Sequence, residues 1–253
     1  MVRRHDPDRF LTALFAPPDR RDALLTLFAF NHELARAREV VSEPPLALIR
    51  LQWWREVVEG AVRRHEVAEP LAAILDAGLL SRADLLAIIE AREIEAEQTI
   101  TTFEEWRSYV MGSAGGVAVA AARLLGAPVP EELRPLGAAF GVAGVLRSVR
   151  LLAARGRCLL PADLIEEQGL SVEAAIAAPD GAPVHAVLQR LVLEGRAMLK
   201  QGRPAVVPRH AIAAALPAVL ARRDLARWPA TVGDERGFAD RLAVTLAGIR
   251  GRI

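Results

Sequence analysis

With 253 residues, the chain is long enough to bury a large apolar core, as one domain or as two. Its 32 Lys and Arg residues nearly balance its 31 Asp and Glu residues, and a net charge of +1 argues against nucleic-acid binding driven by bulk charge. The sequence has a single cysteine, Cys158, which excludes an intramolecular disulfide and a cysteine-rich metal site.

The first residues, MVRRHDPDRF, lack the apolar core of a signal peptide. We also expect no apolar run of the roughly 18–20 residues that a membrane span requires. The nearest candidate, residues 211–221, is shorter and contains Pro217. These features predict a cytoplasmic protein.

Prolines and capping residues divide the first half of the chain into predicted helices. Ser81 and Thr102 each precede an acidic residue by three positions, the pattern of a capping box at a helix start. The first predicted helix is residues 8–15. The second is capped by Asp19 and runs to Leu34, and Pro44 and Pro45 close this segment. Further helices are predicted at residues 46–62, after Ser81, and at residues 103–125.

The second half shows the same helical periodicity and has no convincing alternating strand pattern. Helices are expected at residues 130–154, 184–201, 209–228 and 234–249, with a short helix and loop within 166–183. No linker is long or polar enough to mark a boundary. The prediction is one all-α domain over residues 1–253.

The segment 137–163 is the most informative part of the chain. Gly137, Gly141 and Gly144 lie on or near one face of a predicted helix, although each glycine costs a helix about 1 kcal/mol relative to alanine. This pattern predicts close approach by a neighbouring helix or, as the lesser alternative, a ligand cavity. The basic residues Arg147, Arg150, Arg155 and Arg157 follow, before Pro161 and Asp163.

This segment resembles the second signature of the squalene/phytoene synthase family. The family's acidic residues at this signature fall on Ser148, Leu151 and Leu152, none of which is acidic. Its first aspartate-rich signature falls on residues 29–39, where the paired aspartates are replaced at or beside Ala35 and Arg36. Residues 106–116 resemble a further family helix.

The resemblance implies an isoprenoid-synthase-type helical bundle with a central cavity. It also implies that the chemistry is lost, because Mg²⁺ requires hard oxygen ligands, and Ser, Leu and Arg supply almost none. We therefore assign no catalytic residue, no metal ligand and no cofactor. The alternative is a divergent prenyltransferase that condenses isoprenyl diphosphates with Mg²⁺ through other carboxylates, namely Glu33, Glu90, Glu93 or Glu97.

Residues 29–35, 41–43 and 48–55 resemble a catalytically degenerate branch of the family, which is related to a mitochondrial assembly factor for respiratory complex I. That resemblance implies a binding or assembly role. We predict that a vestigial diphosphate pocket binds a lipid or isoprenoid, whose anionic head group is held by arginines. The alternative for those arginines is that they form ion pairs on the protein surface. The predicted vestigial pocket consists of Asn31, Glu33, Arg36, Arg147, Ser148, Arg150, Arg155 and Arg157.

The expected partners are subunits of a membrane-bound respiratory complex. Peripheral contact with the inner membrane is a further expectation, based on the apolar residues 211–220 and on a basic-aromatic cluster, Arg222, Arg223, Arg227 and Trp228. The alternative is that this apolar helix closes the bundle and packs entirely inside it.

Overall fold

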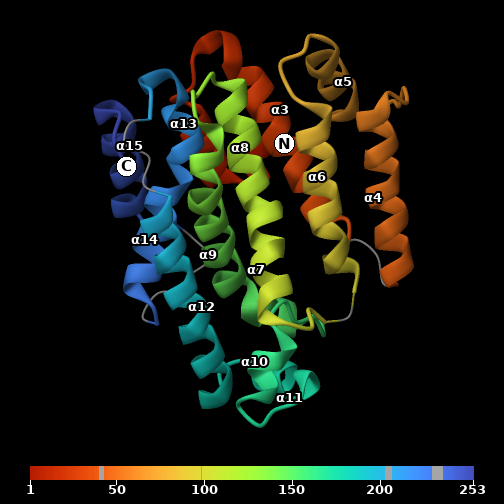
Figure 1. Ribbon diagram of the computed structural model, residues 1–253, viewed down its shortest axis with the longest axis vertical. Helices are drawn as coiled ribbons and strands as arrows, with labels where there is room; N and C mark the ends of the chain where they lie inside the picture. Colours follow the sequence, from red (N-terminus) through yellow and green to blue (C-terminus); the bar gives the residue numbers. More distant parts are fainter. Residues whose placement is uncertain (40–42, 98, 203–206, 230–235) are drawn as a thin grey trace.

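The computed structural model describes residues 1–39, 43–97, 99–202, 207–229 and 236–253. Within these ranges the regular structure is helical, apart from an isolated parallel bridge between Ile100 and Pro161. The predicted all-α class is confirmed. Most of the longer helices lie side by side along the long axis of the molecule (Figure 1).

The first half of the chain forms nine helical elements within the described residues. They are α1 (Val2–His5), α2 (Pro7–Ala13), α3 (Pro18–Arg36), α4 (Pro44–Glu59), α5 (Ala68–Asp76), α6 (Arg82–Glu93), η1 (Ile94–Ala96), α7 (Phe103–Gly112) and α8 (Ala114–Leu124). Pro44 and Pro45 begin α4 instead of ending the preceding segment, because proline is tolerated in the first turn of a helix.

The predicted continuous helix over 103–125 is wrong, because the chain breaks at Ser113. The backbone there leaves the helical region, with φ −77° and ψ −82°, and the Ser113 hydroxyl donates to the Tyr109 carbonyl at 2.6 Å. Such a side-chain bond to the preceding turn competes with the regular backbone pattern. The predicted start is confirmed, since Thr102 and Glu105 form both bonds of a capping box.

The second half contains α9 at its centre. Its elements are η2 (Pro130–Leu133), α9 (Arg134–Ala153), α10 (Ala162–Glu166), α11 (Val172–Ala177), α12 (Ala182–Gln201), η3 (Arg209–Ala211), α13 (Ile212–Ala215), α14 (Pro217–Arg227) and α15 (Phe238–Arg250). The predicted helix over 209–228 is divided before Pro217, which has no N–H to continue the pattern. Residues 234 and 235, the predicted start of the last helix, lie outside the described residues.

Helix α9 packs against α8, α12 and α14, while α4 and α15 lie at opposite edges of the view in Figure 1. A methyl group added at Gly137 would lie 2.5 Å from the Ala118 Cβ, and one at Gly141 would lie 2.7 Å from the Ala114 Cβ. These two glycines therefore permit the predicted close approach of α8 and α9. Gly144 does not share this role, because nothing lies within 4 Å of the corresponding position.

Residues 130–153 form a stretch of 24 residues that is long and apolar enough to cross a membrane, so the prediction that no run reaches this length is wrong. Half of its apolar window is buried inside the bundle. The apolar composition of this stretch is accounted for by the packing of α9 against three neighbouring helices. A buried core helix meets the same test of length and composition.

Candidate functional site

A buried polar network links α3, α6, η1 and α7. The Arg92 guanidinium donates to the Glu95 carboxylate at 2.5 Å and to the Asn31 side-chain oxygen at 2.9 Å. The Tyr109 hydroxyl donates to the same Glu95 oxygen at 2.8 Å. All four side chains are buried, and burial followed by the Glu95 charge raises the pKa of Tyr109. We call Asn31, Arg92, Glu95 and Tyr109 the buried polar network.

Of these four residues, only Asn31 belonged to the predicted pocket. Arg92 nevertheless carries a sequence signal, because it continues the buried stripe of Leu85, Ile88 and Ile89 at helical spacing. An arginine on the apolar face of an amphipathic helix indicates a buried anionic partner. Glu95, three residues later, is that partner.

The carboxylates that the enzyme alternative would recruit lie elsewhere. Glu90 is exposed, and Glu93 forms an ion pair with Arg55 at 2.6 Å. Glu97 follows η1 in an extended conformation, so it does not share a helix face with the other two. The helix ends at Glu93, and the i, i+3, i+4 spacing therefore does not bring the three together.

Glu33 and Arg36 lie near the end of α3. The Glu33 carboxylate is buried and forms an ion pair with the Arg36 guanidinium at 3.2 Å. Beside them, the His32 ring stacks on the His5 ring with centroids 4.9 Å apart. Burial, followed by the charge of His5, lowers the pKa of His32. This end of α3 thus contains a carboxylate that is already neutralised.

Arg155 and Arg157 lie in the turn after α9. Arg155 forms an ion pair with Glu39 at 3.5 Å on the surface. Arg157 is half-buried, and burial lowers its pKa while the negative charge of Glu95 acts in the opposite direction. Arg157 therefore lies within the electrostatic reach of the buried polar network.

The remaining three predicted residues, on α9, make their contacts elsewhere. Arg147 lies 3.4 Å from Asp8 of α2 and 3.9 Å from Asp224 of α14. Ser148 donates its hydroxyl to the Val145 carbonyl at 2.9 Å, within its own helix.

Arg150 is largely exposed and forms an ion pair with Asp180 at 2.7 Å. The ion-pair partners of Arg147 and Arg150 thus lie outside the predicted pocket that contains Asn31 and Glu33. The single arginine wall that the sequence suggested is not what the structure shows, because Arg147, Arg150 and Arg155 each pair with carboxylates of different segments.

Two interior pockets lie between the helices, and both are very small. One, beside Val149 and Leu152, has a volume of about 10 Å³. The other, beside Phe28 and Phe140, has a volume of about 10 Å³ as well. This is roughly the space of one water molecule, far below that of an isoprenoid chain. Neither of these two pockets has the size of the open central cavity that was predicted.

The residues at this end of the bundle do not fit Mg²⁺. The carboxylates of Glu33, Glu39 and Glu95 lie 3.2, 3.5 and 2.5 Å from the arginines that neutralise them. Mg²⁺ requires free anionic oxygens in near-octahedral geometry. Within the part of the chain that the structure describes, no group of three His, Cys, Asp or Glu side chains is placed to hold a metal ion.

The surface predicted to contact a membrane is also placed differently. Residues 211–220 are buried, as in the alternative interpretation that this segment closes the bundle. Arg223 and Arg227 form ion pairs with Asp240 at 2.5 and 2.9 Å. Four exposed apolar side chains lie instead along one side of α15, at Phe238, Leu242, Leu246 and Ile249, and others are scattered over the surface or lie on α4. We call these four residues the apolar face of α15.

Comparison with known proteins agrees with the fold. The family model of squalene/phytoene synthase matches residues 2–246. A dehydrosqualene synthase crystallised with a ligand superposes with a TM-score of 0.79 at 14% identity, covering 98% of this chain and 93% of that one. Squalene synthase HpnC from Alicyclobacillus acidocaldarius gives 0.66 at 19% identity, covering 99% and 91%. The predicted isoprenoid-synthase type of bundle is confirmed.

Sequence relatives divide between two kinds of protein. Human NADH dehydrogenase (ubiquinone) complex I, assembly factor 6 is 25% identical over 211 residues, which cover 80% of this chain and 63% of that protein. The 15-cis-phytoene synthase of Paracoccus sp. (strain N81106) is 28% identical over 199 residues, covering 71% and 63%. The chain thus spans less than two thirds of the length of these relatives.

Proposed function

Because the chain belongs to the squalene/phytoene synthase family but carries arginine-neutralised carboxylates at the vestigial pocket, we propose that it is a non-catalytic binding or assembly protein. The proposed partners are subunits of a membrane-bound respiratory complex, and in particular of complex I. The observation that carries the non-catalytic part is the buried ion pair between Arg92 and Glu95.

This ion pair keeps Glu95 from serving as a metal ligand. For Glu95 to bind Mg²⁺, its carboxylate would have to leave Arg92, which is 8% exposed. Leaving a buried charge without its partner costs about 3–5 kcal/mol. A divalent cation beside the Arg92 guanidinium would also be repelled. The arginine therefore occupies the electrostatic role that a metal ion would have.

The support for complex I is the similarity to assembly factor 6 over 80% of the chain. The same helical bundle can serve unrelated binding functions in different proteins. The similarity is therefore the reason for this proposal, and the experiment described below tests it. The similarity to a phytoene synthase supports the alternative, a divergent prenyltransferase that condenses isoprenyl diphosphates. Squalene- or phytoene-like products from the purified protein would decide for that alternative.

The apolar face of α15 gives this proposal a surface for peripheral contact with the cytoplasmic side of the inner membrane. Phe238 is 80% exposed and Ile249 is 58% exposed. The acidic residue of α15, Asp240, is buried in ion pairs, whereas Arg241 and Arg250 are exposed. An apolar helix face flanked by cations suits an anionic lipid surface, where each cation contributes about 1 kcal/mol.

The test is a deletion of the gene in its host, followed by native-gel quantification of assembled complex I and by its NADH oxidation rate. We expect both to fall and to return when the wild-type gene is restored. The Arg63→Ala variant, which breaks the exposed ion pair with Glu56, is the control and should restore them equally. Normal complex I levels in the deletion strain would contradict the assembly role.

A further inference from the structure

Helices α12 and α14 are held close together at Gly195. A methyl group there would lie 2.9 Å from the Leu225 Cδ1 and 3.0 Å from the Val142 Cγ1, so the approach depends on the missing side chain. The next residue, Arg196, donates from Nε and Nη2 to the Leu225 carbonyl at 3.2 and 2.6 Å. Carbonyls in the last turn of a helix lack an internal partner. Arg196 is thereby anchored between the two helices.

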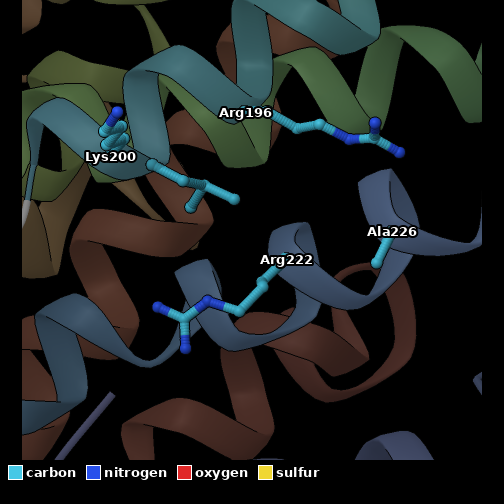
Figure 2. A pocket seen from close by; sticks show the side chains of 5 residues that line it. Arg196, Lys200, Arg222 and Ala226 are labelled. Carbon is cyan, nitrogen blue, oxygen red and sulfur yellow. The ribbon is translucent and has the colours of Figure 1, made fainter.

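A groove of about 550 Å³ opens beside this anchor. We call it the basic groove, and its lining consists of Arg196, Leu199, Lys200, Arg222 and Ala226. The first three share one face of α12 by i, i+3, i+4 spacing, and the last two share one face of α14. Figure 2 shows these side chains around the open space between the two helices. Among the described residues, every charged side chain that lines the groove is a cation.

The acidic residues of the two helices do not neutralise these cations. Glu194 of α12 pairs with Arg107 at 2.9 Å, and Asp224 of α14 pairs with Arg236 at 2.5 Å. Each carboxylate is therefore held by a different part of the bundle. Within the described residues, neither Lys200 nor Arg222 has an ion pair or a hydrogen bond with another side chain.

We propose that the basic groove binds a phosphate-bearing ligand, either a soluble phosphate compound or the headgroup of a phospholipid. The guanidinium of Arg222 presents a fork that matches two phosphate oxygens, and the Lys200 ammonium adds a mobile point charge. Leu199 and Ala226 provide apolar contact for the group that carries the phosphate. A volume of about 550 Å³ is that of an ordinary small-ligand site.

This site is separate from the buried polar network. The basic groove lies between α12 and α14, whereas the buried polar network joins α3, α6, η1 and α7. In the basic groove, Lys200 is exposed and Arg222 is partly exposed, so both can reach a ligand, whereas Arg196 is held by the Leu225 carbonyl. Phosphate binding at the basic groove thus rests on different residues from the proposed assembly role, and either can fail without the other.

The test titrates the purified full chain with sodium pyrophosphate by isothermal titration calorimetry at low salt. The double variant Lys200→Ala/Arg222→Ala should bind at least tenfold more weakly, and Arg222→Lys should fall between the two. Arg190→Ala is the matched control, since Arg190 is exposed on the same helix but outside the basic groove. Thermal melts of all variants verify folding.

A second arm distinguishes the source of the phosphate by co-sedimentation with phosphatidic acid vesicles and with phosphatidylcholine vesicles. Loss of phosphatidic acid binding in the double variant, with displacement by pyrophosphate, assigns a lipid headgroup. Pyrophosphate binding without such loss assigns a soluble phosphate compound. The proposal is overturned if pyrophosphate does not bind, if the double variant binds as the wild type does, or if Arg190→Ala weakens binding equally.

Discussion

The buried polar network and the basic groove use the same kind of side chain in opposite ways. Arg92 is buried, and each of its described bonds goes to a side chain of the protein, Glu95 or Asn31. Arg222 lies at the wall of an open groove, and no carboxylate of the described residues forms an ion pair with it. The first arginine neutralises a buried carboxylate inside the bundle. The second remains available for binding.

This difference teaches that the position of a charge relative to solvent decides its role. Removing a buried arginine that has a buried partner is costly, because the charge of that partner would be left uncompensated. An exposed cation contributes little to stability, since water already solvates it. Substitutions in the interior should therefore change the free energy of unfolding, and substitutions at the surface should change binding.

The largest expected effect is that of Arg92→Ala. This variant leaves the Glu95 carboxylate and the Asn31 amide without their buried partner. We expect the free energy of unfolding to fall by about 3–5 kcal/mol, measured by urea denaturation. Arg63→Ala, which breaks the exposed pair with Glu56, should cost no more than about 1 kcal/mol. Equal losses in both variants would remove the distinction between buried and exposed charges.

The next largest effect concerns the closed interior between α8 and α9. A methyl group at Gly137 would lie 2.6 Å from the Ala114 carbonyl oxygen, so Gly137→Ala should lower the free energy of unfolding by about 1–3 kcal/mol. Gly144→Ala meets nothing within 4 Å and should raise it by up to about 1 kcal/mol through helix propensity. A stabilising Gly137→Ala would show that the interior has room to spare.

A smaller effect is expected from pH. Burial and the charge of His5 lower the folded-state pKa of His32 below 6.5, while Glu33 and Asp6 act to raise it and Arg36 to lower it. Because the unfolded chain then binds the proton more readily, the free energy of unfolding should decrease as the pH falls below about 6.5. His32→Gln should flatten the profile between pH 5 and pH 7.5. An unchanged slope in that variant would assign the dependence to other groups.

The smallest effect on stability is expected at the apolar face of α15. Leu242 and Leu246 are 43% and 39% exposed, so Leu242→Asp/Leu246→Asp should change the free energy of unfolding much less than Arg92→Ala does. The same variant should lose co-sedimentation with anionic vesicles, because two carboxylates would enter the contact surface. Retained vesicle binding would place the lipid contact on another surface.

Local patterns in the sequence predicted much of this fold. The capping box of Thr102 and Glu105 forms as expected, and the periodicity of residues 184–201 corresponds to α12. The break at Ser113 was not predictable from periodicity, because apolar and small residues continue through it. The early start of α4 shows that two prolines can open a helix as well as end one.

The candidate site was less predictable, because it depends on the rotation of helices relative to one another. The loss of acidic residues at Ser148, Leu151 and Leu152 is visible in the sequence. Arg147 pairs with Asp8 and Asp224. Both aspartates lie far from it in the sequence, so the sequence alone could not assign them as its partners. Equally, a periodic pattern shows that a face is buried but not whether side chains fill the space beneath it.

The central claim is that arginines have taken the place of a metal ion at the vestigial pocket. The most direct measurement is the release of pyrophosphate from farnesyl diphosphate and from geranylgeranyl diphosphate by the purified protein, with and without Mg²⁺, beside an active synthase as positive control. The neutralised carboxylates predict no release above the protein-free blank in either condition. Release that requires both the protein and Mg²⁺ would contradict the claim and identify the chain as an enzyme.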